Sequence, residues 1–393
     1  MGNKKKRNKG KKTGSNDPCS CGGGKKYKKC CRDKVDIIKE PVPKEVMEHL
    51  QKEMMITEKL KSVGIYINYV RPIMFKGKKV WAIGSTVYHN RPPNETFHEF
   101  IVFILKITLG QKWWEEQLGL PQEKQHFIMQ SFQAHNNWKI RMQSSATKID
   151  DNIWAAIPDG WSRGLISLAF DVATLTHAQR LPEHLITRLK TKDQYQGARY
   201  EVAVAAMIAR LNCKIEFLDT TTSDKHCEFI ATHNESGQVF GVEAKSRHRK
   251  GVLHTEGITK DEEKLLKGDV NRIFNESLKQ RPAGMPYYIF IDLNSPMTPG
   301  KEMQEKPWFK GVQKILSRQG TPTQENPDLF NGIFITNFSY HYQSFRKADP
   351  GEVLSVIPLI PENKPDKKDM TVLIHQAASN YGNVPDLDIE TRF

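Results

Sequence analysis

Residues 227–245 read CEFIATHNESGQVFGVEAK, and this stretch decides the fold that we expect. Two mostly apolar runs, residues 227–232 and 238–245, flank the turn sequence Asn-Glu-Ser-Gly, a pattern typical of two antiparallel strands. If the turn is centred between residues 235 and 236, Glu228 and Glu243 are equidistant from that centre and face each other. Directly opposed strand residues have Cβ atoms roughly 4.5–5.5 Å apart, and like charges there are destabilising. The hairpin therefore predicts a positive charge between the two carboxylates.

A divalent cation and a lysine are the candidates for that charge. Carboxylate oxygens are hard ligands that suit Mg²⁺, and Mn²⁺ is the alternative that we expect at the same place. Lys245 follows Glu243 by two residues and therefore lies on the same face of the strand. Its ammonium could hold an attacking water and stabilise the negative charge that develops during hydrolysis of a phosphodiester. The sequence thus predicts a catalytic magnesium or manganese site on this hairpin.

The segments around the hairpin give an order of helix, three strands, helix and strand. Residues 200–211 have the apolar spacing of an amphipathic helix. The further elements that we expect are strands at 213–218, 287–293 and 333–337, and a helix at about 261–279. Residues 296–327 are predicted to be an insertion with its own short helix near Trp308.

This order and the triplet Glu243-Ala244-Lys245 resemble the PD-(D/E)XK nuclease superfamily, which has the restriction-endonuclease-like fold. The resemblance implies a metal-dependent nuclease in which Glu201, Glu228 and Glu243 hold the metal and Lys245 positions the water. One departure is that position 228 carries Glu where the family usually has Asp. Asp224, four residues earlier, is the second candidate for that role.

Four cysteines within the first 31 residues predict a zinc site. Cys19, Cys21, Cys30 and Cys31 follow the spacing Cys-x-Cys-x8-Cys-Cys, and four thiolates so close together suit tetrahedral zinc. The glycines between the two pairs let the backbone bend back, and zinc binding would supply folding energy that so short a peptide lacks.

The cysteine segment resembles the SEC-C motif. The likeness rests on Pro18 before the first pair, the glycine-rich turn, the Lys-Lys-Tyr-Lys-Lys centre at 25–29 and the closing Cys30-Cys31. It implies structural zinc and an adaptor that often docks to proteins.

Charge is concentrated at the N-terminus. Residues 1–34 contain thirteen Lys and Arg against Asp17 and Asp33, and so carry most of the net charge of +14. Such a tail attracts nucleic acid or another polyanion, although a disordered, solvated tail is the alternative. We expect no membrane span and no secretory signal, because the longest apolar run is short and contains Lys106. The clustering of cysteines favours a reducing, cytoplasmic location.

The middle of the chain is predicted to be mostly helical. The predicted helices are 43–63, 96–114 with Asn94 as a possible cap, 122–142, 161–179 and a short one after Pro182; two strand-like runs lie within 66–87, around Gly77. Trp113, Trp114, Trp138, Trp154 and Trp161 are interpreted as core and inter-helix packing, with a nucleic-acid stacking platform as the alternative.

The sequence therefore predicts an α+β or α/β multidomain chain. Its expected parts are a disordered basic tail (1–17), a zinc knuckle (18–33), a mostly helical domain (35–192), a nuclease-like domain (193–350) and a C-terminal extension (351–393). The expected function is Mg²⁺-dependent hydrolysis of nucleic acid, with DNA expected rather than RNA, and the zinc knuckle could dock a protein partner. The alternative is a non-catalytic, zinc-dependent adaptor that binds a protein or nucleic acid.

Overall fold

The structure is a computed structural model that describes residues 69–148, 153–179, 181–218, 226–253, 257–258, 262–317, 320–343 and 345–384, together with Lys44, Met47, Glu48 and Gln51. The chain divides into two compact units, Met1–Leu50 and Gln51–Phe393. The four isolated residues are helical, and the rest of the helix predicted at 43–63 lies outside the described residues, as do the cysteine motif and Asp224. All described residues from Gln51 onward belong to the second unit.

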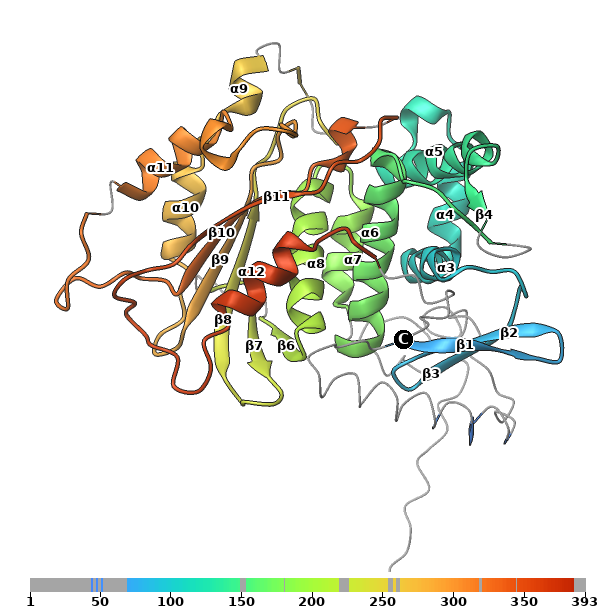
Figure 1. The fold of residues 1–393 in the computed structure, drawn as a ribbon, viewed down its shortest axis with the longest axis horizontal. Helices are drawn as coiled ribbons and strands as arrows, with labels where there is room; N and C mark the ends of the chain where they lie inside the picture. The colour runs from blue at the N-terminus through green and yellow to red at the C-terminus, as the bar shows by residue number, and fades with distance from the viewer. Residues whose placement is uncertain are drawn as a thin grey trace, which may run out of the picture. The chain divides into compact units, whose positions relative to one another are not determined.

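A six-stranded mixed sheet forms the C-terminal half of this unit (Figure 1). Its strands are β6 (Cys213–Phe217), β7 (Phe229–His233), β8 (Val239–Ser246), β9 (Tyr287–Asp292), β10 (Gly332–Asn337) and β11 (Glu352–Val356). The order across the sheet is β11-β10-β9-β8-β7-β6. The three central strands β8, β9 and β10 are parallel, and the outer pairings are antiparallel. The chain therefore combines helices with a mixed sheet, as the sequence predicts.

Helices precede and follow the hairpin strands in the predicted order. Helix α8 (Tyr195–Arg210) comes before β6, and it begins five residues earlier than the sequence suggests. The single helix predicted at 261–279 is two helices, α9 (Glu262–Leu266) and α10 (Asn271–Leu278). The predicted short helix of the insertion is α11 (Phe309–Ser317).

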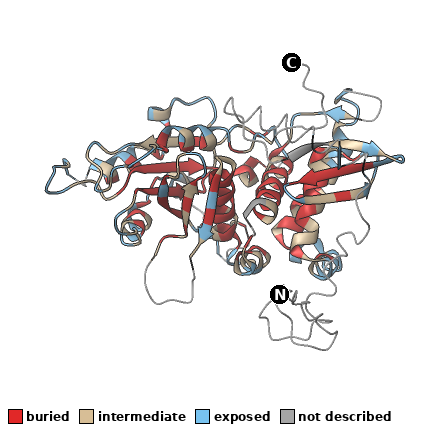
Figure 2. Cartoon of the chain, turned by 90° about the horizontal axis from the view of Figure 1, so that it is seen from below, coloured by how far each residue is buried: buried red, intermediate tan, exposed pale blue. Residues whose placement is uncertain are grey.

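The central strand β9 is buried along its whole length, and its alternate side chains enter two different cores. Tyr288 and Phe290 belong to the core that includes α8, whereas Ile289 and Ile291 pack with α10 and α11 on the opposite face. A strand covered by helices on both faces needs apolar residues at every position, which explains its continuous apolar sequence. Figure 2 shows buried residues running through this sheet and the helices against it.

The N-terminal half of the unit contains the helices predicted from periodicity, with corrections at their ends. They are α3 (Phe97–Leu109), α4 (Gln111–Leu118), α5 (Phe127–Met142), α6 (Gly160–Thr174) with a π-helical continuation (Leu175–Gln179), and α7 (Glu183–Lys190). The first helix is capped by Thr96 in a capping box with Glu99, not by Asn94. It ends at Gly110, whose φ of 92° breaks the continuous helix that the sequence predicts as far as residue 114.

A three-stranded sheet precedes these helices. It consists of β1 (Tyr69–Phe75), β2 (Lys78–Ile83) and β3 (Thr86–Arg91), and Gly77 lies in the turn between the first two. The two predicted strand-like runs are confirmed, and the third strand was not expected. Trp81 of β2 stacks on Phe100 of α3 at 4.8 Å, which joins this sheet to the helices.

Helix α6 packs against α8, so that the helices and the six-stranded sheet form one continuous core. Arg210 of α8 donates to Asp171 of α6 at 2.8 Å, and Tyr381 donates to the other oxygen of that carboxylate at 2.8 Å. The structure therefore has extensive contacts across residue 192, where the sequence predicts a domain limit, and residues 51–393 form a single compact unit.

Residues 351–384, which the sequence assigns to a C-terminal extension, are integrated into the fold. They supply the edge strand β11 and helix α12 (Thr371–Ser379), which packs on α8 and β10. Glu352 of β11 is buried and accepts hydrogen bonds from Lys306 (2.7 Å), Trp308 (3.0 Å) and Asn337 (3.0 Å). Within the described part of the chain, no helix has both the length and the apolar character needed to span a bilayer.

We predict that Glu352→Ala lowers the free energy of unfolding by about 3–5 kcal/mol, because it leaves the buried Lys306 ammonium without its carboxylate. Urea unfolding of full-length protein measures the change. Glu276→Ala is the matched control, since Glu276 is exposed and forms only a surface i,i+4 ion pair with Arg272. Equal, small losses in both variants would contradict the structural role of Glu352.

Candidate active site

The hairpin of β7 and β8 has the register that the sequence predicts. Phe229 pairs with Val242 and Thr232 with Val239, so the turn is centred between Glu235 and Ser236. Gly237 closes this turn with a φ of 67°, a left-handed conformation that glycine adopts without strain. Glu228 precedes β7, so the ladder does not include the direct pairing of Glu228 with Glu243 that the sequence predicts; the Glu228 amide donates instead to the Val242 carbonyl at 3.1 Å.

Lys245 joins the two acidic side chains of this hairpin. Its Nζ donates to Glu228 Oε1 at 2.7 Å and forms an ion pair with Glu243 Oε1. Since one ammonium reaches both carboxylates, all three side chains lie on the same face of the hairpin. The side chain of Glu243 is fully buried, whereas those of Glu228 and Lys245 are 21% and 29% exposed. The cluster is thus closed at Glu243 and open to solvent at Lys245.

Helix α8 brings a third carboxylate, Glu201, towards the hairpin. Burial is the largest cause of the raised pKa of Glu243, and the charge of Glu201 adds to it. Glu201 is held by both guanidinium nitrogens of Arg188 on α7, with Nη2 donating to Oε1 at 2.6 Å. Gly197 lies one turn before Glu201. A Cβ atom placed on Gly197 would lie within 4 Å of Arg188 Nη2 and His248 Nε2. Sequence analysis missed Arg188, because no spacing rule connects two separate helices.

The cluster has more acidic than basic side chains, and this raises the pKa of one of its carboxylates. Three carboxylates face two cations, Lys245 and Arg188. Burial, together with the charges of Glu228 and Glu201, raises the pKa of Glu243 to about 8, although Lys245 opposes the shift. Burial alone would lower the pKa of Lys245, but the two hairpin carboxylates raise it above its ordinary value. Lys245 therefore stays charged at neutral pH, and Glu243 is the group that takes up a proton.

The oxygen atoms of the cluster fit a hard divalent cation. Glu243 is fully buried, and within the described part of the chain its Oε2 has no hydrogen-bond partner, an arrangement that is costly unless another positive group approaches. Carboxylate oxygens are the ligands that Mg²⁺ and Mn²⁺ prefer. As the described residues stand, no three Asp, Glu, His or Cys side chains converge on one point, because Lys245 lies between the hairpin carboxylates and Arg188 holds Glu201.

A basic loop, residues 247–250, follows β8. Arg249 is buried and donates to four backbone carbonyls, among them Asn294 at 3.1 Å and Leu265 at 2.6 Å. Arg247 forms an ion pair with Asp269. These two arginines hold the loop against its neighbours, so His248 and Lys250 are the exposed members of the loop.

His226, Cys227 and His248, which flank the hairpin, form no metal-binding group within the described residues. Cys227 is a buried free cysteine, and burial raises the pKa of its thiol to about 12. A thiol with such a pKa stays protonated at neutral pH and is a poor metal ligand. Cys213 is also buried and free, and its pKa is raised to about 12 for the same reason.

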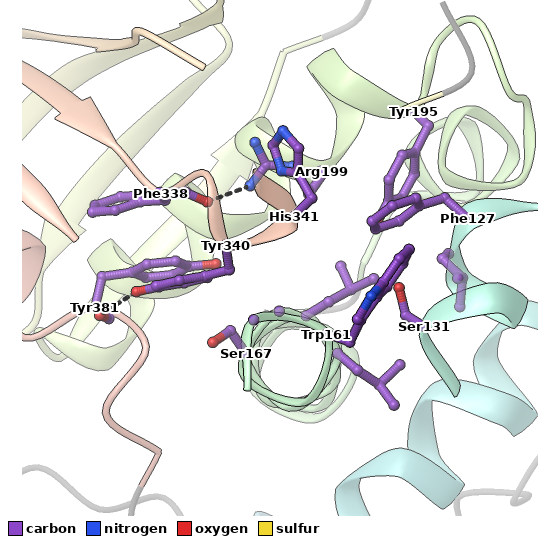
Figure 3. Close-up of a pocket in the computed structure, with 15 residues that line it drawn as sticks. Phe127, Ser131, Trp161, Ser167, Tyr195, Arg199, Phe338, Tyr340, His341 and Tyr381 are labelled. Atoms are coloured by element: carbon purple, nitrogen blue, oxygen red, sulfur yellow. Dashed lines mark hydrogen bonds between the residues drawn. The ribbon is translucent and has the colours of Figure 1, made fainter. Parts of the chain in front are cut away.

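A small cavity between α6, α8 and the 3₁₀ turn Tyr340–Gln343 is a second candidate site (Figure 3). Its volume of about 30 Å³ accommodates about one water molecule, not a nucleotide. Arg199, which lines it, is paired with the buried Asp292 at 3.0 Å, and the Tyr340 hydroxyl donates to the Tyr381 carbonyl at 3.0 Å. We therefore interpret this cavity as a small packing gap between the helices and the sheet, not as a ligand site.

Comparisons of the chain with protein-family models, curated proteins and solved structures give no match. A function for the chain must therefore rest on the contacts of the site itself.

We predict that Glu243→Gln stabilises the metal-free protein increasingly as pH rises from 5.5 to 8.5. The pKa of Glu243 is higher in the folded protein than in the unfolded chain, so protonation of Glu243 stabilises the fold. This stabilisation is fully present below pH 4.5, the ordinary pKa, and is lost as the pH rises through about 8. Thermal unfolding across this range measures the difference between variant and wild type. Glu216→Gln on the exposed side of β6 is the control, and a pH-independent difference for Glu243→Gln would refute the prediction.

Proposed function

We propose that the chain is a Mg²⁺- or Mn²⁺-dependent nuclease that hydrolyses phosphodiester bonds of DNA. The single observation that supports this most is the position of Lys245 between Glu228 and Glu243 on one face of a buried hairpin. The element order of α8, three strands, α10 and β9 also agrees with the resemblance to PD-(D/E)XK nucleases and the restriction-endonuclease-like fold.

In this proposal Glu201, Glu228 and Glu243 hold the metal, which supplies a Lewis acid for the phosphate and lowers the pKa of a bound water. Glu243 must lose its proton for this role, so metal binding strengthens as pH rises towards 8. Arg188 orients Glu201 through its two hydrogen bonds. The partial exposure of Lys245 and Glu228 leaves one side of the cluster accessible to a phosphodiester.

Lys245 acts as a fixed positive charge and hydrogen-bond donor, not as a general base, because its neighbouring carboxylates keep it protonated. Its Nζ orients a water and stabilises the extra negative charge on the phosphorus oxygens in the transition state. The buried wall formed by Glu243 and the strand excludes bulk water from the other side, which strengthens these interactions.

We predict that Lys245→Ala lowers the cleavage rate of plasmid and single-stranded DNA by at least about 100-fold in Mg²⁺ or Mn²⁺, because it removes the charge that stabilises the transition state. Gel assays measure the rate, and Lys279→Ala, which replaces an exposed lysine at the end of α10, should leave it unchanged. Lys245→Gln keeps more of the side chain's packing and should be equally impaired. Wild-type protein that cleaves neither substrate, or a Lys245→Ala variant as active as wild type, would refute the nuclease.

The four N-terminal cysteines favour the second candidate, a non-catalytic adaptor that binds a partner through a zinc knuckle. We predict about one zinc ion per chain, held by Cys19, Cys21, Cys30 and Cys31. Cys30→Ser/Cys31→Ser should lose this ion in elemental analysis, whereas Cys213→Ser should retain it, since Cys213 is buried in the core. Unchanged zinc in the double variant would refute the knuckle. Absence of cleavage with retained partner binding would favour the adaptor.

A further inference from the structure

A large cavity lies among the helices, on the side of α6 that faces away from α8. Its walls come from α3 and α5, from Ile166 of α6 and from the short strand β5 (Trp154–Ala155), which pairs with β4 (Thr147–Lys148). Helices α3 and α5 both pack on α6, which in turn packs on α8 (Figure 1). The cavity volume is about 910 Å³, in the range of roughly 300–1,000 Å³ that small-molecule sites occupy.

Aromatic side chains line this cavity. Phe103, Phe132, Trp138 and Trp154 contribute to its walls, and Trp154 is 51% exposed. The neighbouring Ile140 is 70% exposed. Exposed apolar groups at the rim of a concave site mark a place where another molecule binds. The sequence predicts that the tryptophans pack in the core. Trp114, which is 2% exposed, does so, but Trp154 does not.

Among the described residues, two histidines in the cavity wall have buried nitrogen atoms with no hydrogen-bond partner. These atoms are Nδ1 of His135, whose residue is 6% exposed, and Nε2 of His98. Burial lowers the pKa of His135 to about 4, so its ring is neutral at pH 7. A neutral imidazole can donate or accept a hydrogen bond. Unsatisfied buried polar atoms beside a cavity are the groups that a polar ligand would satisfy.

The cavity also carries positive charge. Its two acidic lining residues, Glu95 and Glu99, are ion-paired with Arg91 and Lys139. Lys106 forms no ion pair within the described residues and lies 5.7 Å from the Phe132 ring. An unpaired cation beside an aromatic surface suits a ligand that combines a planar ring with a phosphate.

We propose that this cavity receives one unstacked base of a single-stranded nucleic acid, which stacks on Trp154 and meets Lys106 with its phosphate. That the ligand is a nucleic acid rests on the proposed nuclease function. The cavity adds that the bound strand is single-stranded. Bases in a duplex are paired and stacked within the helix, so entry into the cavity would require one of them to be unpaired and unstacked first.

Fluorescence anisotropy with fluorescein-labelled dT10, rU10 and a 10-base-pair DNA duplex tests the inference, in full-length protein carrying Lys245→Ala and without added divalent metal. We expect Trp154→Ala to weaken dT10 binding by at least about fivefold, the effect of losing one stacked base. Duplex binding, which we expect to depend on the basic tail, should be unchanged. Leu359→Ala, an exposed apolar residue near β11, is the control. The rU10 arm distinguishes RNA from DNA as the strand that binds more tightly.

A second probe separates stacking from charge. The probe is dT10 with abasic sites at its central positions. Wild-type protein should bind this oligonucleotide as weakly as Trp154→Ala binds intact dT10. Trp154→Ala should bind intact and abasic dT10 with the same affinity. Equal dT10 affinity in wild type and Trp154→Ala, or equal losses for duplex and single strand, would overturn the inference. Loss of cleavage in every assay with this binding pattern intact would refute the nuclease and leave the cavity assignment standing.

Discussion

The ion pairs of Lys245 with Glu228 and Glu243 are the constraint on which the site depends. One ammonium holds two carboxylates that would otherwise repel each other across adjacent strands. Glu243 is fully buried, so its charge is costly without a close cation. Arg188 does the same for Glu201 at the adjoining helices. Even with both cations the cluster keeps an excess of acid, which is why the pKa of Glu243 rises to about 8.

The surrounding fold keeps these groups in place from several directions. The turn that ends at Gly237 sets which residues of β7 and β8 face each other. Helix α8 carries Glu201 towards the hairpin while Arg210, near its other end, binds Asp171 of α6. Strand β9 pairs with β8 along Glu243 and Lys245 and fills both cores with alternate side chains. The arrangement of the site is therefore a consequence of how the sheet and two layers of helices pack.

Local patterns in the sequence predicted the parts of this arrangement that depend on near neighbours. The hairpin register follows from one turn, and the strands follow from apolar runs, so both could be predicted. Arg188, the buried Arg249 and the edge strand β11 depend on contacts between distant segments, and no local spacing reveals them. The break at Gly110 and the cap at Thr96 show that helix ends are decided by single residues. The zinc knuckle stays a prediction, because its cysteines lie outside the described residues.

The most direct test of a metal site on the hairpin is anomalous diffraction from crystals of the protein soaked in Mn²⁺. We expect a manganese peak in contact with carboxylate oxygens of Glu228 and Glu243, with Lys245 displaced from at least one of them. Crystals of Glu243→Gln should lack that peak. A well-ordered Lys245 still bound to both carboxylates at saturating Mn²⁺, with no anomalous density beside them, would contradict a metal-dependent active site.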